Sequence, residues 1–106
     1  MKIYNVYVIE LSSDVMKVKK FRNKNPDYLP GNKCYYIGQS YRSPELRFDQ
    51  HKEGYKSNRF AKEFGLRLRY DIFKRYNPIP SRTDALEIES YLTNKLRLEG
   101  NAVWSN

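Results

Sequence analysis

The chain has 106 residues, 40% of them hydrophobic and 30% charged, and we expect residues 1–106 to form a single folded domain. The apolar run Val6–Ile9 is far shorter than a transmembrane helix, so we expect no membrane partner. The single cysteine, Cys34, excludes an internal disulfide and a cysteine zinc site. A chain without disulfides is typical of a reducing compartment, so we expect a cytoplasmic protein. Twenty Lys and Arg against twelve Asp and Glu give a net charge of +8, which excludes an acidic protein and is typical of a domain that binds nucleic acid.

Two segments in the first half of the chain are rich in β-forming residues. Residues 2–11 predict a strand, and residues 34–40 predict a second strand. Strand alternation places Tyr36 and Gly38 on the same face of the second strand. The intervening residues 12–33 predict a long polar loop.

Two helices are expected after the second strand. Ser43 is a suitable N-cap, Pro44 fits the first helical position, and Gly54 ends the helix. A shorter helix is predicted over residues 57–64, and it ends at Gly65.

The last third of the chain predicts one more strand and a long helix. Residues 66–73 alternate apolar and polar side chains, as a half-buried strand does. Ser81 or Thr83 caps a helix that extends to about Leu98. This order predicts an α/β (α+β) fold in which a small three-stranded, mainly antiparallel sheet is flanked by helices.

Five polar residues on these elements form a spaced set, and two of them together suit a phosphate. Arg47 and His51 are four residues apart and share a face of the first helix, where we expect an exposed position. Arginine supplies a fixed charge for a phosphate, and histidine supplies a proton that exchanges between about pH 6 and 8. The set consists of Tyr7, Tyr36, Arg47, His51 and Glu89.

Glu89 differs from Glu87 in its position on the long helix. At about 100° per residue, Glu89 lies close to the apolar stripe of that helix and Glu87 lies on the far side. The stripe consists of Ala85, Ile88, Leu92 and Leu96. A carboxylate near a buried face needs compensation for its lost hydration, and a divalent cation or an arginine would provide it.

These residues resemble the GIY-YIG nuclease family in type, order and spacing. The resemblance extends over about residues 2–98, almost the whole chain. The segments that carry it are Asn5-Val6-Tyr7-Val8-Ile9, Tyr36-Ile37-Gly38-Gln39-Ser40, Leu46-Arg47 with His51, and Ala85 with Glu89.

The chain also departs from the family pattern. Asn5 and Val6 stand where the family's first motif has glycine and isoleucine, and the loop between the two motifs is longer than usual. For the family's terminal asparagine, Asn101 is the best match, with Asn94 and Asn106 as alternatives.

The resemblance implies a metal-dependent DNA endonuclease that hydrolyses phosphodiester bonds. Mg²⁺ or Mn²⁺ would be held by Glu89, and Arg47 would neutralise charge on the phosphate. Tyr7 or Tyr36, with His51 nearby, would take the proton from the attacking water. One such site cuts one strand, so a double-strand cut would need two protomers of a homo-oligomer or two sequential events. No separate DNA-reading domain fits in 106 residues, so specificity would come from the domain's own loops, from DNA structure or from an accessory partner. The alternatives are a non-catalytic nucleic-acid-binding module on the same fold and a basic protein-binding adaptor.

One stretch of the predicted loop is strongly basic. Its five cations, with no acid among them, are Lys17, Lys19, Lys20, Arg22 and Lys24. The loop connects the two tyrosine motifs, which are the segments of Tyr7 and Tyr36 quoted above. We therefore expect these cations to bind the DNA backbone beside the cut. The alternative is a mobile loop whose cations are only solvated. Arg67 and Arg69 of the third predicted strand offer an alternative path for the DNA.

Overall fold

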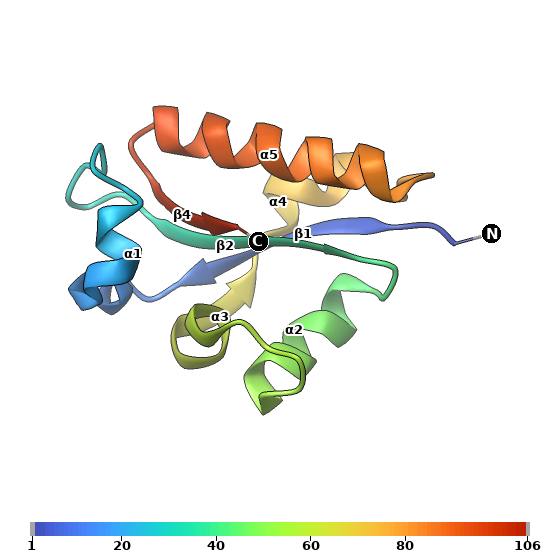
Figure 1. Cartoon of the computed structure of the whole chain (residues 1–106), viewed down its shortest axis with the longest axis horizontal. Helices are drawn as coiled ribbons and strands as arrows, with labels where there is room; N and C mark the ends of the chain where they lie inside the picture. The colour runs from blue at the N-terminus through green and yellow to red at the C-terminus, as the bar shows by residue number, and fades with distance from the viewer. Residues whose placement is uncertain (1, 106) are drawn as a thin grey trace.

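The computed structural model describes residues 2–105 and has a four-stranded sheet at its centre, in the order β3-β1-β2-β4 (Figure 1). The strands are β1 (Asn5–Leu11), β2 (Cys34–Ser40), β3 (Gly65–Leu68) and β4 (Ala102–Ser105). β1 pairs antiparallel with β2 and β3, and β4 pairs parallel with β2. The mixed class and the mainly antiparallel sheet are confirmed, whereas the expected count of three strands is wrong.

The additional strand is β4, which has only four residues after the turn at Gly100 and is too short for an alternating pattern. It is a strand because its backbone pairs with β2. This ladder ends where Ile37 lies opposite Ser105. Beyond that point no residue of 2–105 pairs with this side of β2.

Helices cover both faces of the sheet (Figure 1). One face carries α5 (Arg82–Leu98) and the short α4 (Tyr70–Phe73), which runs on into the 3₁₀ turn η2 (Lys74–Tyr76). The other face carries α1 (Lys19–Asn23), α2 (Pro44–Glu53) and α3 (Arg59–Phe64). β1 is therefore buried on both faces. Among residues 2–105, no helix has the length and hydrophobicity that a membrane crossing needs.

The segment expected as a polar loop is partly helical and contributes to the core. It contains the 3₁₀ helix η1 (Ser13–Lys17) and then α1. Val15 and Phe21 are fully buried, and the Phe21 ring packs against Phe60 and Trp104. The prediction failed because the few apolar residues of this stretch are interspersed with lysines and show no clear periodicity.

The strand expected over residues 66–73 is also corrected. β3 covers only its first part, and α4 begins at Tyr70. Leu66 and Tyr70 are 49% and 43% exposed, so the alternating residues do not form a buried face. β3 is an edge strand that pairs only with β1, and few neighbours cover its side chains.

The three predicted helices are confirmed, with small changes at their ends. The Ser43 side chain accepts a hydrogen bond from the Leu46 backbone, and Gly54 ends α2 in the left-handed conformation. α3 starts at Arg59, two residues later than expected. The N-cap of α5 is Ser81, whose side chain accepts from the Asp84 backbone.

Candidate active site

Tyr7 and Gly38 lie opposite each other in the β1–β2 ladder. A Cβ atom placed on Gly38 would be 2.5 Å from the Tyr7 hydroxyl oxygen and 2.6 Å from its Cζ. Only glycine therefore leaves room for the tyrosine ring at this position. The Tyr36 ring packs beside it, with the two centroids 6.2 Å apart.

His51 is buried on α2 and is held through both ring nitrogens. The Asn58 backbone N–H donates to Nδ1 at 3.0 Å, and Nε2 lies 2.9 Å from the Tyr7 hydroxyl oxygen. Arg47 Nη2, which can only donate, also lies 3.1 Å from Nε2. The Asn58 contact favours a proton on Nε2, whereas the Arg47 contact favours Nε2 as an acceptor, so the direction of the Tyr7–His51 hydrogen bond depends on the tautomer.

The electrostatic environment keeps His51 uncharged. Burial, together with the positive charge of Arg47, lowers the pKa of His51 to about 4. A second proton on Nδ1 would also face the Asn58 N–H, donor against donor. The expected exchange of a proton between pH 6 and 8 is therefore wrong for this ring.

Arg47 is only 8% exposed, although an exposed helix position was expected. Its Nη1 donates to the Gln50 side chain at 2.7 Å, and its Nη2 donates to the Lys56 carbonyl at 3.1 Å. No carboxylate of residues 2–105 forms an ion pair with it. A buried guanidinium without a counter-charge is costly, so this arrangement favours an anion such as phosphate.

The residue that holds Arg47 has an unusual backbone. Lys56 has φ 44, in the left-handed region that side-chain-bearing residues rarely adopt. Strain of this kind persists where the surrounding structure enforces it, often at functional sites. Here it places the Lys56 carbonyl where Arg47 can donate to it.

Glu89 lies on the buried side of α5, as predicted, with 4% exposure, whereas Glu87 is exposed. Burial raises the pKa of Glu89 to about 7, and the positive charge of Arg82 opposes this. Within residues 2–105 no side chain forms a hydrogen bond or ion pair with this carboxylate.

A buried carboxylate without a partner fits a Mg²⁺-type ion. Mg²⁺ keeps several waters and binds through one or two carboxylates together with substrate phosphates. The part of the chain that the structure describes has no group of three or more His, Cys, Asp or Glu residues that could hold a metal. Glu89 is thus the residue that would hold such an ion beside the tyrosines.

Tyr7 lies within electrostatic range of residues from both helical layers. Burial raises the pKa of Tyr7, the charge of Arg47 lowers it, a hydrogen bond from Tyr36 lowers it further, and the charge of Glu89 raises it. Arg47 and His51 belong to α2 on one face of the sheet, and Glu89 belongs to α5 on the other.

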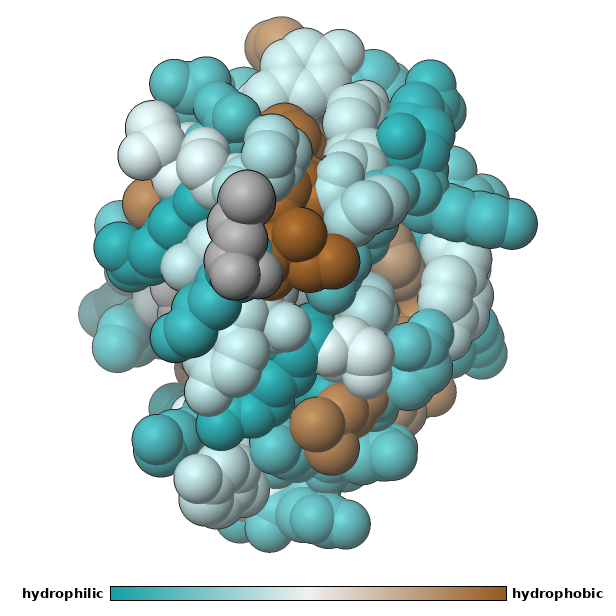
Figure 2. Space-filling model, turned by 90° about the vertical axis from the view of Figure 1, so that its right-hand side faces the viewer, coloured by the Kyte–Doolittle hydropathy of each residue, from teal (hydrophilic) through white to brown (hydrophobic). Residues whose placement is uncertain are grey.

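A groove of about 290 Å³ adjoins this cluster at the same end of the molecule. Its charged lining residues are all positive, and they are Arg42, Arg47, Lys56 and Arg82. We call it the four-cation groove. Figure 2 shows this end of the molecule, whose surface is mainly hydrophilic with small, separate hydrophobic areas.

The basic loop lies at the other end of the sheet (Figure 1). It leaves β1 at Leu11, opposite Cys34, four residues along the ladder from Tyr7 and Gly38, or roughly 13 Å. Its five cations are exposed on η1, on α1 and directly after α1, and they are Lys17, Lys19, Lys20, Arg22 and Lys24. The structure does not bring them to the cluster.

Arg67 and Arg69 lie on β3 and directly after it, and carboxylates already neutralise them. Both donate to the buried Glu10 carboxylate, at 2.8 and 3.0 Å. Arg69 also pairs with Asp71 at 3.0 Å. Neither cation lines the four-cation groove.

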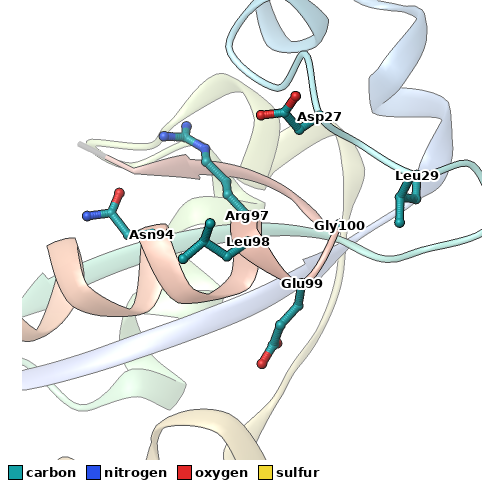
Figure 3. Close-up of a pocket in the computed structure, with 7 residues that line it drawn as sticks. All are labelled: Asp27, Leu29, Asn94, Arg97, Leu98, Glu99 and Gly100. Atoms are coloured by element: carbon teal, nitrogen blue, oxygen red, sulfur yellow. The ribbon is translucent and has the colours of Figure 1, made fainter.

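The candidate asparagines also lie elsewhere. Asn101 accepts a hydrogen bond from the Lys33 backbone at the far end of β2. Asn94 lines a separate pocket of about 710 Å³ at the C-terminal end of α5, together with Asp27 and Arg97 (Figure 3). Asn106 lies outside the described residues.

Sequence reasoning missed three groups that position the cluster: Gln50, Lys56 and Asn58. Gln50 is three residues after Arg47 on one helix, a spacing that could have revealed the contact. Asn58 could have been recognised as the N-cap of α3, where its side chain accepts from Phe60 and Ala61. Nothing local in the sequence indicates that a backbone carbonyl will reach Arg47 or that a backbone N–H will reach His51.

A family model described as the GIY-YIG catalytic domain matches residues 4–101. No curated protein and no solved structure matches the chain significantly. The matched range includes both tyrosine motifs, Arg47, His51 and Glu89, and it covers nearly the whole chain. The chain therefore belongs to the GIY-YIG family of nucleases.

Proposed function

We propose that this protein is a DNA endonuclease that hydrolyses phosphodiester bonds with the help of one Mg²⁺-type ion. The proposal rests on two buried groups of opposite charge, neither of which forms an ion pair with a counter-charge. Arg47 has no carboxylate, and Glu89 has no cation within ion-pair distance among residues 2–105. A phosphate would satisfy the first and a metal ion the second.

His51 and Arg47 hold the Tyr7 oxygen in the position of a base. His51 Nε2 lies 2.9 Å from this oxygen and shares a hydrogen bond with it. When the Tyr7 proton passes to solvent, the charge of Arg47 stabilises the phenolate. The phenolate then takes a proton from the attacking water and becomes a phenol again.

Burial keeps Tyr7 protonated in the free protein, so its activation needs added positive charge. Mg²⁺ held at Glu89 would polarise the phosphate and stabilise the leaving oxygen when bound. Tyr36 packs edge-on against His51, with ring centroids 5.2 Å apart, and is the second candidate for the base. Tyr36→Phe and Tyr7→Phe variants, compared for cleavage rate, distinguish the two.

A plasmid-cleavage assay tests the function. With Mg²⁺ the protein should convert supercoiled plasmid to nicked circles before linear DNA appears, because one site cuts one strand. EDTA should abolish this, and Mn²⁺ should replace Mg²⁺. DNA binding without cleavage under all these conditions would instead indicate a non-catalytic nucleic-acid-binding module.

A further inference from the structure

The four-cation groove is assembled from separate parts of the chain. Arg42 lies in the turn between β2 and α2, Arg47 on α2, Lys56 in the loop after α2, and Arg82 in the first turn of α5. No Asp or Glu lines the groove. Cations gathered in this way repel one another unless an anion lies among them.

Ion pairs neutralise some cations of the protein, but not those of the groove. Within residues 2–105, Arg42, Lys56 and Arg82 form no ion pair with a carboxylate. Cations elsewhere do, and they are Lys17, Lys33, Arg59, Arg67, Arg69 and Lys95. The groove therefore keeps its positive charge available.

The rim of the groove gathers further positive charge around one aromatic ring. The half-exposed Tyr41 also lines the groove. Lys2 Nζ lies 4.6 Å from the centroid of its ring, and Arg42 Cζ lies 4.8 Å from it. Cation–π contacts of this kind hold flexible basic side chains in place without neutralising them.

We propose that the four-cation groove binds the backbone phosphate next to the one that is cut, with Arg82 as its principal ligand. This inference rests on the proposed function, in which Arg47 contacts the scissile phosphate. Arg47 also lines the groove, so one strand can bridge both positions. Arg82 thereby fixes the direction in which the substrate strand leaves the active site.

The size of the groove indicates what it recognises. A volume of about 290 Å³ lies at the lower end of small-ligand pockets, ~300 Å³. It accommodates one phosphate with its sugar, from one strand of the DNA. A guanidinium matches phosphate oxygens in a bidentate arrangement, so the contact reads the backbone and carries no base sequence.

The test replaces single phosphates of a short DNA duplex with neutral methylphosphonates and measures binding by fluorescence anisotropy in EDTA. Arg47→Ala identifies the phosphate at the catalytic position, because that variant no longer responds to its neutralisation. Arg82→Ala should bind roughly 10- to 100-fold more weakly and should no longer respond at the neighbouring phosphate. Its slope of log K against log salt should fall by about 0.9.

Arg75→Ala is the matched control. Arg75 is exposed and forms no ion pair within residues 2–105, but it lies on η2, outside the groove, so its removal should leave both readouts unchanged. The proposal is wrong if DNA binding by Arg82→Ala still responds to the neutralisation of every phosphate. It is also wrong if the response is lost at a phosphate that is not adjacent to the one assigned to Arg47. Failure of the unaltered protein to cleave plasmid with Mg²⁺ would overturn the proposed function instead, and that is a separate assay.

Discussion

The two basic regions of this protein look alike in composition and differ in structure. The basic loop carries five cations within eight consecutive residues, and it lies at one end of the sheet. The four-cation groove lies at the other end, next to the tyrosines, and its cations are spread over 41 residues of sequence, from Arg42 to Arg82.

The surroundings of the cations distinguish the two regions. In the loop, Lys17 pairs with Asp14, Arg22 donates to backbone carbonyls of η1, and Lys20 lies over the Trp104 ring. In the groove, Arg47 is buried with neutral partners only. Density of charge along the sequence thus indicates solvation as readily as function, whereas buried charge without a counter-ion indicates a ligand.

The largest effect is expected at Glu89. Glu89→Gln keeps the size of the side chain and removes the charge that would hold Mg²⁺, so plasmid cleavage should fall by about 10³-fold. DNA binding in EDTA should be retained, because the groove cations are untouched. Glu87→Gln, on the exposed face of the same helix, should cleave normally, and equal losses in the two variants would remove Glu89 from the site.

Arg47→Ala should lower the cleavage rate by about 10²-fold, because it removes the charge that faces the phosphate. Since Arg47 is buried, its loss also leaves the Lys56 carbonyl without its donor, and circular dichroism should accompany the kinetics. Arg22→Ala in the basic loop is the comparison. A loop variant that slowed cleavage of bound DNA as strongly would reverse the assignment of the two regions.

Gly38→Ala tests the geometry of the cluster without changing any charge. The added methyl group collides with the Tyr7 phenol, so we expect a decrease of about 1–3 kcal/mol in the free energy of unfolding. Cleavage should fall more than DNA binding, because Tyr7 moves while the groove does not. Gly31→Ala, at an open but left-handed position in the loop, should leave the cleavage rate unchanged.

The pH dependence of the cleavage rate should follow the ionisation of Glu89. Its pKa of about 7 means that Mg²⁺ competes with a proton below that pH, so cleavage should rise as pH increases through 7. His51→Gln should lower the rate but leave this inflection in place, because the pKa of His51 is about 4. Disappearance of the inflection in His51→Gln would assign it to His51.

The raised pKa of Glu89 also predicts how the free energy of unfolding depends on pH when no metal ion is bound. The folded pKa of Glu89 is raised above its unfolded value, so the folded state holds an extra proton between about pH 4.5 and 7. The free energy of unfolding should therefore fall as pH rises through this window. Urea denaturation of the protein and of Glu89→Gln should show a steeper fall for the former.

The smallest effect is expected from the basic loop. Replacing Lys17, Lys19, Lys20, Arg22 and Lys24 with Ser should weaken DNA binding and reduce the salt slope by about 0.9 for each DNA phosphate that the loop no longer neutralises. Turnover of bound DNA should be unchanged, because the loop lies at the far end of the ladder. An unaltered salt slope would leave the four-cation groove as the main path of the DNA.

Local signals explain which parts of the fold were predictable. Ser43 and Pro44 specify the start of α2 through adjacent residues, and the position of Glu89 follows from helix periodicity. β4 could not be predicted, because its structure depends on pairing with β2, which is a distant segment of the chain. Arg82 was missed for the same reason, since only the folded chain brings it near Arg47.

The buried Asn25 has a consequence for how the chain folds. Its Oδ1 accepts from the Val103 N–H at 2.7 Å, across 78 residues of sequence, and its Nδ2 donates to the Phe21 carbonyl. One side-chain amide therefore joins the insertion between β1 and β2, which contains η1 and α1, to the final strand β4. Bringing such distant segments together costs chain entropy, so this junction should form late in folding. The insertion and β4 should accordingly gain protection from hydrogen exchange together, as one cooperative unit.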